Sequence, residues 1–203
     1  MPRKFSQRAD DLRRALAQEA ARVMAQQGIE DFLQAKRKAA ERLGVDDAAV
    51  LPRNTEIEAA LRDYQRLFGG TRHDQTLKEQ RRTALAAMQM LREFQPRLVG
   101  PVLAGTATGH SEISLHVFAE PAESVALKLL DIGVPHEVHE RRVRMDAERT
   151  LNYPALRFHA EEWLVEATVF PVDGIRQSPY SPVDGKPMRR ADVREVLELI
   201  DAG

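Results

Sequence analysis

The chain has 203 residues, of which 43% are hydrophobic and 30% are charged, and its formal net charge is -1. This length suffices for one large domain or two small ones, and the apolar fraction can supply a core for either. A net charge so close to zero gives no general attraction to nucleic acid or to a membrane surface. Because the chain has no cysteine, disulfides, thiolate zinc sites and cysteine nucleophiles are excluded.

The beginning of the sequence is polar and charged, where a secretory signal would need an apolar run. No apolar stretch of about 18 residues, the length needed to span a membrane as a helix, occurs in the sequence. We therefore expect a cytoplasmic protein that has no membrane partner.

The first 95 residues show the hydrophobic periodicity of helices. Apolar residues recur at helical spacing over residues 10–27 and 29–43, and a glycine follows each of these segments. Two Thr-x-x-Glu patterns, which are typical of helix N-termini, predict further helices over residues 54–68 and 76–95. We interpret residues 1–95 as a helical N-terminal region.

After Pro96 the pattern changes to that of a mixed domain. Strands are predicted where apolar residues run together or alternate with polar ones, over residues 98–104, 112–118, 134–145, 155–158 and 163–170. A short helix is expected over 124–130 and a last helix over 193–200, with a loop rich in Pro, Gly and Ser before it. The fold class is therefore α+β: a helical bundle over residues 1–95, then an α/β domain with a small mixed sheet over 96–203.

The most unusual stretch is Ala-Gly-Thr-Ala-Thr-Gly-His-Ser at residues 104–111. One interpretation is a phosphate-binding P-loop, but the segment is one glycine and one lysine short of Gly-x-x-x-x-Gly-Lys-Ser. A P-loop must also lead into a helix whose N-terminus faces the anion, whereas this segment leads into a strand pattern. The sequence therefore disfavours the P-loop interpretation.

A second interpretation starts from the strands that follow. Because side chains alternate along a strand, Glu112, Ser114 and His116 share one face of the strand that begins there. Glu166 lies opposite Val165 and Ala167 in the same way. If the two strands are neighbours in one sheet, two carboxylates, a hydroxyl and an imidazole converge beside a glycine turn. Oxygen-rich groups of this kind bind Mg²⁺.

This pattern resembles the nucleotidyltransferase superfamily, the DNA polymerase β-like fold, over roughly the last half of the chain. In that family a Gly-Ser turn follows a first strand, two carboxylates stand one residue apart on the next strand, and a third lies on a later strand. Gly105 and Thr106 take the place of the turn. Glu112 and Ser114 take the two adjacent positions, and Glu166 takes the third.

The resemblance implies an Mg²⁺-dependent enzyme, with Mn²⁺ as an alternative metal, that transfers a nucleoside monophosphate from a nucleoside triphosphate to an unidentified acceptor, for which RNA and protein are candidates. Glu112 and Glu166 would bind the metal, and the backbone of Gly105 and Thr106 would bind phosphate. Ser114 and His116 would assist as catalytic groups. A neutral Ser114 in place of a carboxylate weakens a two-metal site. The alternatives are a catalytically incomplete nucleotide- or RNA-binding regulatory module and a helical protein-interaction adaptor.

Basic residues near the expected last helix form a second candidate group. Arg189 and Arg190 are expected to open that helix, where its dipole disfavours cations, and Lys186 precedes them. A bound anion would account for all three, which makes them candidate nucleotide-binding residues. A salt bridge to the acidic C-terminal half explains the two arginines equally well.

For the other candidates, ordinary structural roles remain open. Glu112 and Glu166 can be solvated residues on the exposed face of a sheet. His136 and His139 are three residues apart on a strand, so they face opposite sides and are expected at the surface. The basic residues Arg141, Arg142 and Arg144 are candidates for binding phosphates, since Arg142 and Arg144 share a face, but such charges are also typical of strand edges that avoid pairing with other chains.

Overall fold

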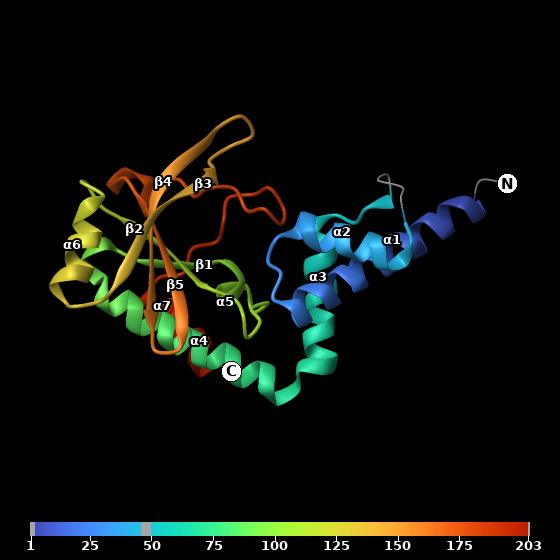
Figure 1. The fold of residues 1–203 in the computed structure, drawn as a ribbon, viewed down its shortest axis with the longest axis horizontal. Helices are drawn as coiled ribbons and strands as arrows, with labels where there is room; N and C mark the ends of the chain where they lie inside the picture. The colour runs from blue at the N-terminus through green and yellow to red at the C-terminus, as the bar shows by residue number, and fades with distance from the viewer. Residues whose placement is uncertain (1–2, 46–49, 203) are drawn as a thin grey trace. The chain divides into compact units, whose positions relative to one another are not determined.

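A computed structural model describes residues 3–45 and 50–202 of the chain (Figure 1). It shows a helical N-terminal region followed by a region with a five-stranded mixed sheet, which confirms the predicted α+β class. The chain forms two compact units. The first extends to His73 and includes the loop segments 108–110 and 182–184, and the second contains the rest.

The first unit is built from three helices: α1 (Arg3–Gln27), α2 (Phe32–Leu43) and α3 (Asn54–Tyr64). Its core is rich in alanine, which lets the helix backbones approach closely. The fully or almost fully buried members are Leu16, Ala17, Ala20, Ala21 and Met24 from α1, Ala35 and Ala39 from α2, and Ile57 and Leu61 from α3.

The third and fourth predicted helices are joined without a loop. A π-helical turn, η2 (Gln65–Gly69), follows α3 directly, and α4 (Gly70–Met90) follows η2. The sequence predicted a break at the two glycines and a new helix from residue 76, and this was wrong: Gly70 adopts a φ of +49° at the junction and the chain continues as helix. The C-terminal half of α4 buries Ala84, Ala87 and Met88 in the core of the second unit.

The sheet of the second unit has the strand order β1-β2-β5-β4-β3. Only β2 and β5 run parallel, and the other neighbours are antiparallel. The strands are β1 (Arg97–Val99), β2 (Ile113–Phe118), β3 (His136–Arg144), β4 (Thr150–Ala160) and β5 (Trp163–Phe170). The remaining elements of this unit are the 3-10 turns η3 (Arg92–Phe94) and η4 (Val172–Arg176) and the helices α5 (Gly100–Ala104), α6 (Glu123–Asp131) and α7 (Val193–Asp201).

The two faces of the sheet differ in chemistry. One face carries the apolar residues of β2, β4 and β5, and these form a core with α4, α6 and α7 (Figure 1). The other face carries the polar residues Ser114, His116, Glu166 and Thr168, of which the last three are buried. The alternation in the sequence therefore predicted correctly which residues of β2 and β5 share a face.

The strand predicted over residues 98–104 was mostly wrong. The strand ends at Val99, and residues 100–104 form α5. Gly100 has a φ of +72°, and Pro101 stands at the first turn of α5, where its missing N–H costs nothing. Proline has no N–H to donate to a neighbouring strand, and its fixed φ suits the first turn of a helix, so the Gly-Pro pair explains the early end.

In the part of the chain that the structure describes, no helix combines the length and the apolar character needed to cross a membrane.

Candidate functional site

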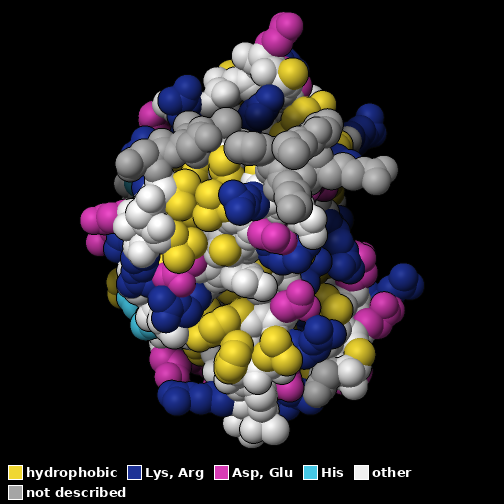
Figure 2. All heavy atoms as spheres, turned by 90° about the vertical axis from the view of Figure 1, so that its right-hand side faces the viewer, with side chains coloured by type: hydrophobic (Ala, Val, Ile, Leu, Met, Phe, Trp, Pro, Cys, Tyr) yellow, Lys and Arg dark blue, Asp and Glu magenta, His cyan; other side chains and the backbone are white. Residues whose placement is uncertain are grey.

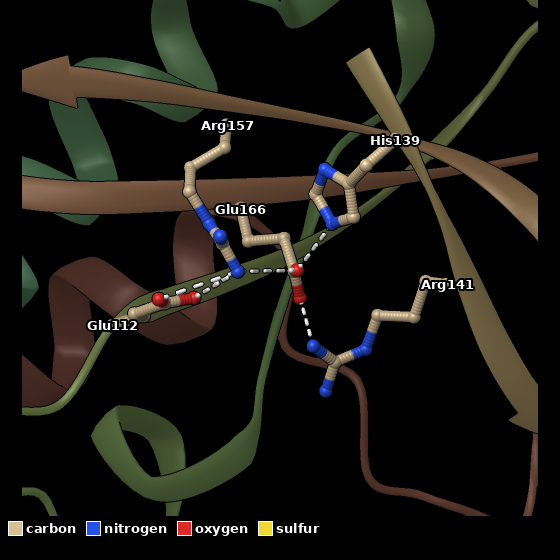
Figure 3. Close-up of polar contacts among 5 residues, drawn as sticks. All are labelled: Glu112, His139, Arg141, Arg157 and Glu166. Carbon is tan, nitrogen blue, oxygen red and sulfur yellow. Dashed lines mark hydrogen bonds and ion pairs between the residues drawn. The ribbon is translucent and has the colours of Figure 1, made fainter. Parts of the chain in front are cut away.

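Glu112 and Glu166 meet on the polar face of the sheet (Figure 3). Glu112 directly precedes β2, Glu166 lies in the middle of β5, and these two strands are parallel neighbours. The Nη2 atom of Arg157, from β4, lies 3.4 Å from an oxygen of Glu112 and 3.4 Å from Oε1 of Glu166. A single guanidinium therefore bridges the two carboxylates that the sequence proposed as a pair.

Two further groups from β3 contact Glu166. Nε2 of His139 lies 2.8 Å from Oε1, and Nη1 of Arg141 bonds to Oε2. When the carboxylate is ionised, Nε2 of His139 is the donor in this contact, because an ionised carboxylate only accepts hydrogen bonds. Because the side chain of Glu166 is only 2% exposed, both of its oxygens depend on protein donors in place of water.

These contacts correct three interpretations. Glu166 is buried and paired, so it is not a solvated residue on an exposed face. His139 was expected to be a surface residue, but its ring contacts Glu166. His136 lies on the opposite side of β3, as predicted. Arg141 bonds to the same carboxylate, so its role exceeds the protection of a strand edge. Glu112 remains partly exposed, with 28% of its side chain accessible.

A glycine turn lies beside Ser114, and its glycine is Gly100 in place of the expected Gly105. Ser114 pairs with Val99 on one side and with Glu166 on the other. A Cβ atom placed on Gly100 would lie 3.6 Å from both Cβ and Oγ of Ser114. The turn that follows the first strand and lies beside Ser114 is therefore at residue 100.

The structure places Gly105 and Thr106 at the other end of α5. Gly105 is the left-handed C-cap of that helix, with a φ of +79°, and a Cβ atom placed on it would meet the side chains of Arg81 and Leu77 from α4. Thr106 is buried, and its N–H donates to the carbonyl of Pro101. The expectation that residues 102–104 end the first strand, on which the assignment of Gly105 depended, is wrong because these residues are helical.

His116 is buried and held by Arg190. Nε of Arg190 donates to Nδ1 of His116 at 3.0 Å, so the proton of the neutral ring is on Nε2. Burial lowers the pKa of His116 well below its ordinary value, and the positive charges of Arg190 and Arg141 add to this. Any role of His116 toward a ligand therefore belongs to a neutral imidazole through Nε2.

Arg190 itself anchors the loop that follows β5. Its Nη1 donates to the carbonyls of Gly174 and Ile175, and its guanidinium lies 5.0 Å from the centre of the Phe118 ring. Burial, with the nearby charge of Arg97, lowers the pKa of Arg190 to about 10. These contacts are those of an arginine that fastens a loop to the sheet.

The other two basic candidates lie apart from these contacts. The last helix begins at Val193 and is capped by Asp192, so the expectation that the two arginines open it was wrong. Arg189 is exposed and forms an ion pair of 3.7 Å with Glu195, which is the salt bridge that the sequence left as an alternative. Lys186 is exposed in the preceding loop.

Sequence reasoning missed Arg157 and underrated His139 and Arg141. Arg157 stands between the buried residues Leu156 and Phe158, so alternation along β4 places it on the polar face. His139 and Arg141 share a face of β3 for the same reason. The alternation within each strand therefore indicated which side chains share a face. It did not indicate that β4 pairs with β5.

This face of the sheet offers two carboxylates and a hydroxyl as oxygen ligands. In the described ranges 3–45 and 50–202, no cluster of three or more acidic or histidine side chains is arranged to bind a metal. Mg²⁺, however, is commonly bound by one or two carboxylates together with substrate phosphates and water. Glu112 and Glu166 supply two carboxylates around a point where a cation, the Arg157 guanidinium, already lies, with the Ser114 hydroxyl on the same face.

The helical unit has a separate surface feature. An open groove of about 920 Å³ is lined by α1, α3 and η2, together with Leu43 at the end of α2. Leu67 and Phe68, at its border, are 68% and 72% exposed, and the ring of Phe68 lies 4.9 Å from that of Tyr64. Figure 2 shows a face of the molecule on which hydrophobic side chains form patches between charged ones. Exposed aromatic and aliphatic groups of this kind are typical of interaction surfaces.

No protein-family model, curated protein or solved structure matches this chain.

Proposed function

We propose that the polar face of the sheet binds a nucleoside triphosphate with Mg²⁺ and transfers its nucleoside monophosphate to an acceptor. Glu112 and Glu166 bind the metal, which orients the triphosphate and neutralises charge that develops on it. Arg157 and Arg141 provide positive charge for the phosphates, because guanidinium groups bind phosphate oxygens in a bidentate manner.

The observation that supports this proposal is the shared contact of Glu112 and Glu166. Two acidic residues 54 positions apart in the sequence (166 minus 112) approach the same nitrogen atom at 3.4 Å each. Like charges repel, and here the Arg157 guanidinium lies between the two carboxylates and offsets that repulsion. The arrangement supports the proposal that a bound cation would lie beside Ser114 and the turn at Gly100.

A second function, nucleotide binding without transfer, is favoured by Ser114. A pair of Mg²⁺ ions that share ligands needs more negative charge than two carboxylates supply, because Ser114 contributes only a neutral hydroxyl. One metal ion can still hold a triphosphate in place. The second candidate is therefore a regulatory module that binds the nucleotide and releases it unchanged.

Binding and turnover distinguish the two functions. Fluorescent analogues of ATP and GTP are titrated with Mg²⁺ or Mn²⁺ into the wild-type protein and into Glu112→Gln, which removes one carboxylate at a partly exposed position. Glu162→Gln, at an exposed turn between β4 and β5, is the matched control. Pyrophosphate release is measured in parallel with RNA and protein acceptors.

We expect metal-dependent binding that Glu112→Gln weakens and Glu162→Gln does not. Pyrophosphate release above background supports the transferase, and binding without release supports the regulatory module. Equal nucleotide binding by wild type and Glu112→Gln would remove both functions from this site.

A further inference from the structure

Arg157 differs from the other two groups that contact Glu166 in how firmly it is held. Its contacts with Glu112 and Glu166 are 3.4 Å long, whereas His139 approaches Glu166 to 2.8 Å. Charge-assisted N–H···O bonds are normally about 2.7–2.9 Å long, so the Arg157 contacts are weak ones. The Nε atom of Arg157 is buried and has no hydrogen-bond acceptor among the described residues.

Glu166 does not need Arg157 to stay in place. His139 contacts Oε1 and Arg141 contacts Oε2, so both oxygens are oriented from β3. Oε1 has a second lone pair, which Arg157 uses. The departure of Arg157 would therefore free one acceptor site on Glu166 and the carboxylate of Glu112, without releasing Glu166 itself.

Arg157 can leave the two carboxylates only if another positive charge replaces it there. Two carboxylates face two guanidiniums, from Arg141 and Arg157, so the group is balanced when His139 is neutral. A divalent ion at the position of the Arg157 guanidinium would compete with it, because both need the same oxygens. A displaced guanidinium then needs an anion, and the phosphates of a nucleotide are the anions that the proposed function supplies. The side chain of Arg157 is 36% exposed, so it has a path to solvent.

We infer that Arg157 is an exchangeable cation that bridges Glu112 and Glu166 in the free protein and transfers to the triphosphate when a divalent metal takes its place. Arg157 is thus a positioning residue that couples metal binding to nucleotide binding. The metal alone binds weakly, because Arg157 loses its partners and gains none. The metal with a nucleoside triphosphate binds well, because Arg157 exchanges one set of oxygens for another. This inference rests on the proposed function and adds an order of events to it.

The test measures Mn²⁺ binding by electron paramagnetic resonance, with and without a non-hydrolysable nucleoside triphosphate. Wild type is compared with Arg157→Gln and Arg157→Lys, and with Arg142→Gln as a control. Arg142 is an exposed arginine of β3 that lies on the opposite face from Arg141. Thermal unfolding with and without Mn²⁺ supplies a readout that is independent of turnover and shows that each variant is folded.

In wild type we expect the nucleotide to raise the affinity for Mn²⁺ by about tenfold or more. In Arg157→Gln, Mn²⁺ alone binds about tenfold more tightly than in wild type, and the gain from the nucleotide largely disappears. Arg157→Lys gives intermediate Mn²⁺ affinities, because lysine keeps the positive charge but lacks the planar guanidinium that contacts both carboxylates. Arg142→Gln behaves as wild type.

Two results overturn the inference in distinguishable ways. Binding of Mn²⁺ with nucleotide to wild type, and equally to Arg157→Gln, would show that the site exists and that Arg157 does not compete for it. No Mn²⁺ binding to wild type or to any variant, with or without nucleotide, would reject the proposed function and the inference together.

Discussion

Arg190 donates its Nε–H to Nδ1 of His116 across a distance of 3.0 Å, and this bond joins the last loop of the chain to the centre of the sheet. The acceptor is a neutral ring, and no carboxylate among the described residues forms an ion pair with this guanidinium. Its charge is stabilised by backbone carbonyls of the loop and by the faces of Phe118 and Phe170. Arg190 therefore has a structural role that its neighbour Arg189 does not share.

Replacement of Arg190 by alanine should lower the free energy of unfolding by about 2 kcal/mol, because the loop carbonyls and His116 lose their donor. Arg189→Ala is the matched control. Its ion pair with Glu195 is exposed, so its loss should cost less than about 0.5 kcal/mol. Urea denaturation of both variants measures the difference, and equal effects would contradict the anchoring role.

The buried imidazole of His116 should make stability depend on pH. Its pKa is lowered in the folded protein by burial and by Arg190 and Arg141, so the unfolded chain binds a proton more readily than the native one. The stability from neutral His116 is therefore complete above about pH 6.5 and falls as the pH drops from there toward the lowered folded pKa.

His116→Gln should reduce this loss of stability between about pH 7 and pH 5, because glutamine does not titrate. Denaturation midpoints at several pH values provide the measurement. His159→Gln, which removes an exposed imidazole of β4, should keep the wild-type slope. An unchanged slope in His116→Gln would show that other groups cause the pH dependence.

Glu166→Gln should destabilise the fold even without any ligand. The variant leaves His139, Arg141 and Arg157 around a neutral amide. Removal of one partner from a fully buried ion pair costs roughly 3–5 kcal/mol, and we expect about 2 kcal/mol because Arg141 and Arg157 keep contact with solvent. The double variant Glu166→Gln/Arg141→Gln should lose less than the sum of the single variants, as a double-mutant cycle in urea would show. Strict additivity would argue against their interaction.

Alanine substitutions at Gly100 and Gly105 test which of the two turns contacts the phosphates of a nucleotide. Alanine at either position must adopt a positive φ, which should cost about 1 kcal/mol of stability. Gly44→Ala, with a φ of +63° and no neighbour within 4 Å, controls for this strain. If phosphate approaches at the turn beside Ser114, Gly100→Ala weakens nucleotide binding more than Gly105→Ala does. The reverse order would restore the turn at residues 105 and 106 as the phosphate contact.

Local patterns in the sequence determined the fold class and the faces of the strands. Alternation placed Ser114, His116 and Glu166 on one side, because successive side chains of a strand point to opposite faces whatever the neighbouring strand is. The same rule applies to Arg157. Helical periodicity located most of the helices, and the glycine at residue 44 ends α2 as expected.

Only the tertiary structure decided which strands are neighbours, and this defined the candidate site. The insertion of β5 between β2 and β4 brings Arg157 between Glu112 and Glu166, and the β3–β4 hairpin brings His139 and Arg141 to the same carboxylate. Strand order depends on contacts between distant segments, which the period of a single strand does not encode. The sequence by itself determined which side chains could face one another, and the packing of the sheet determined which ones do.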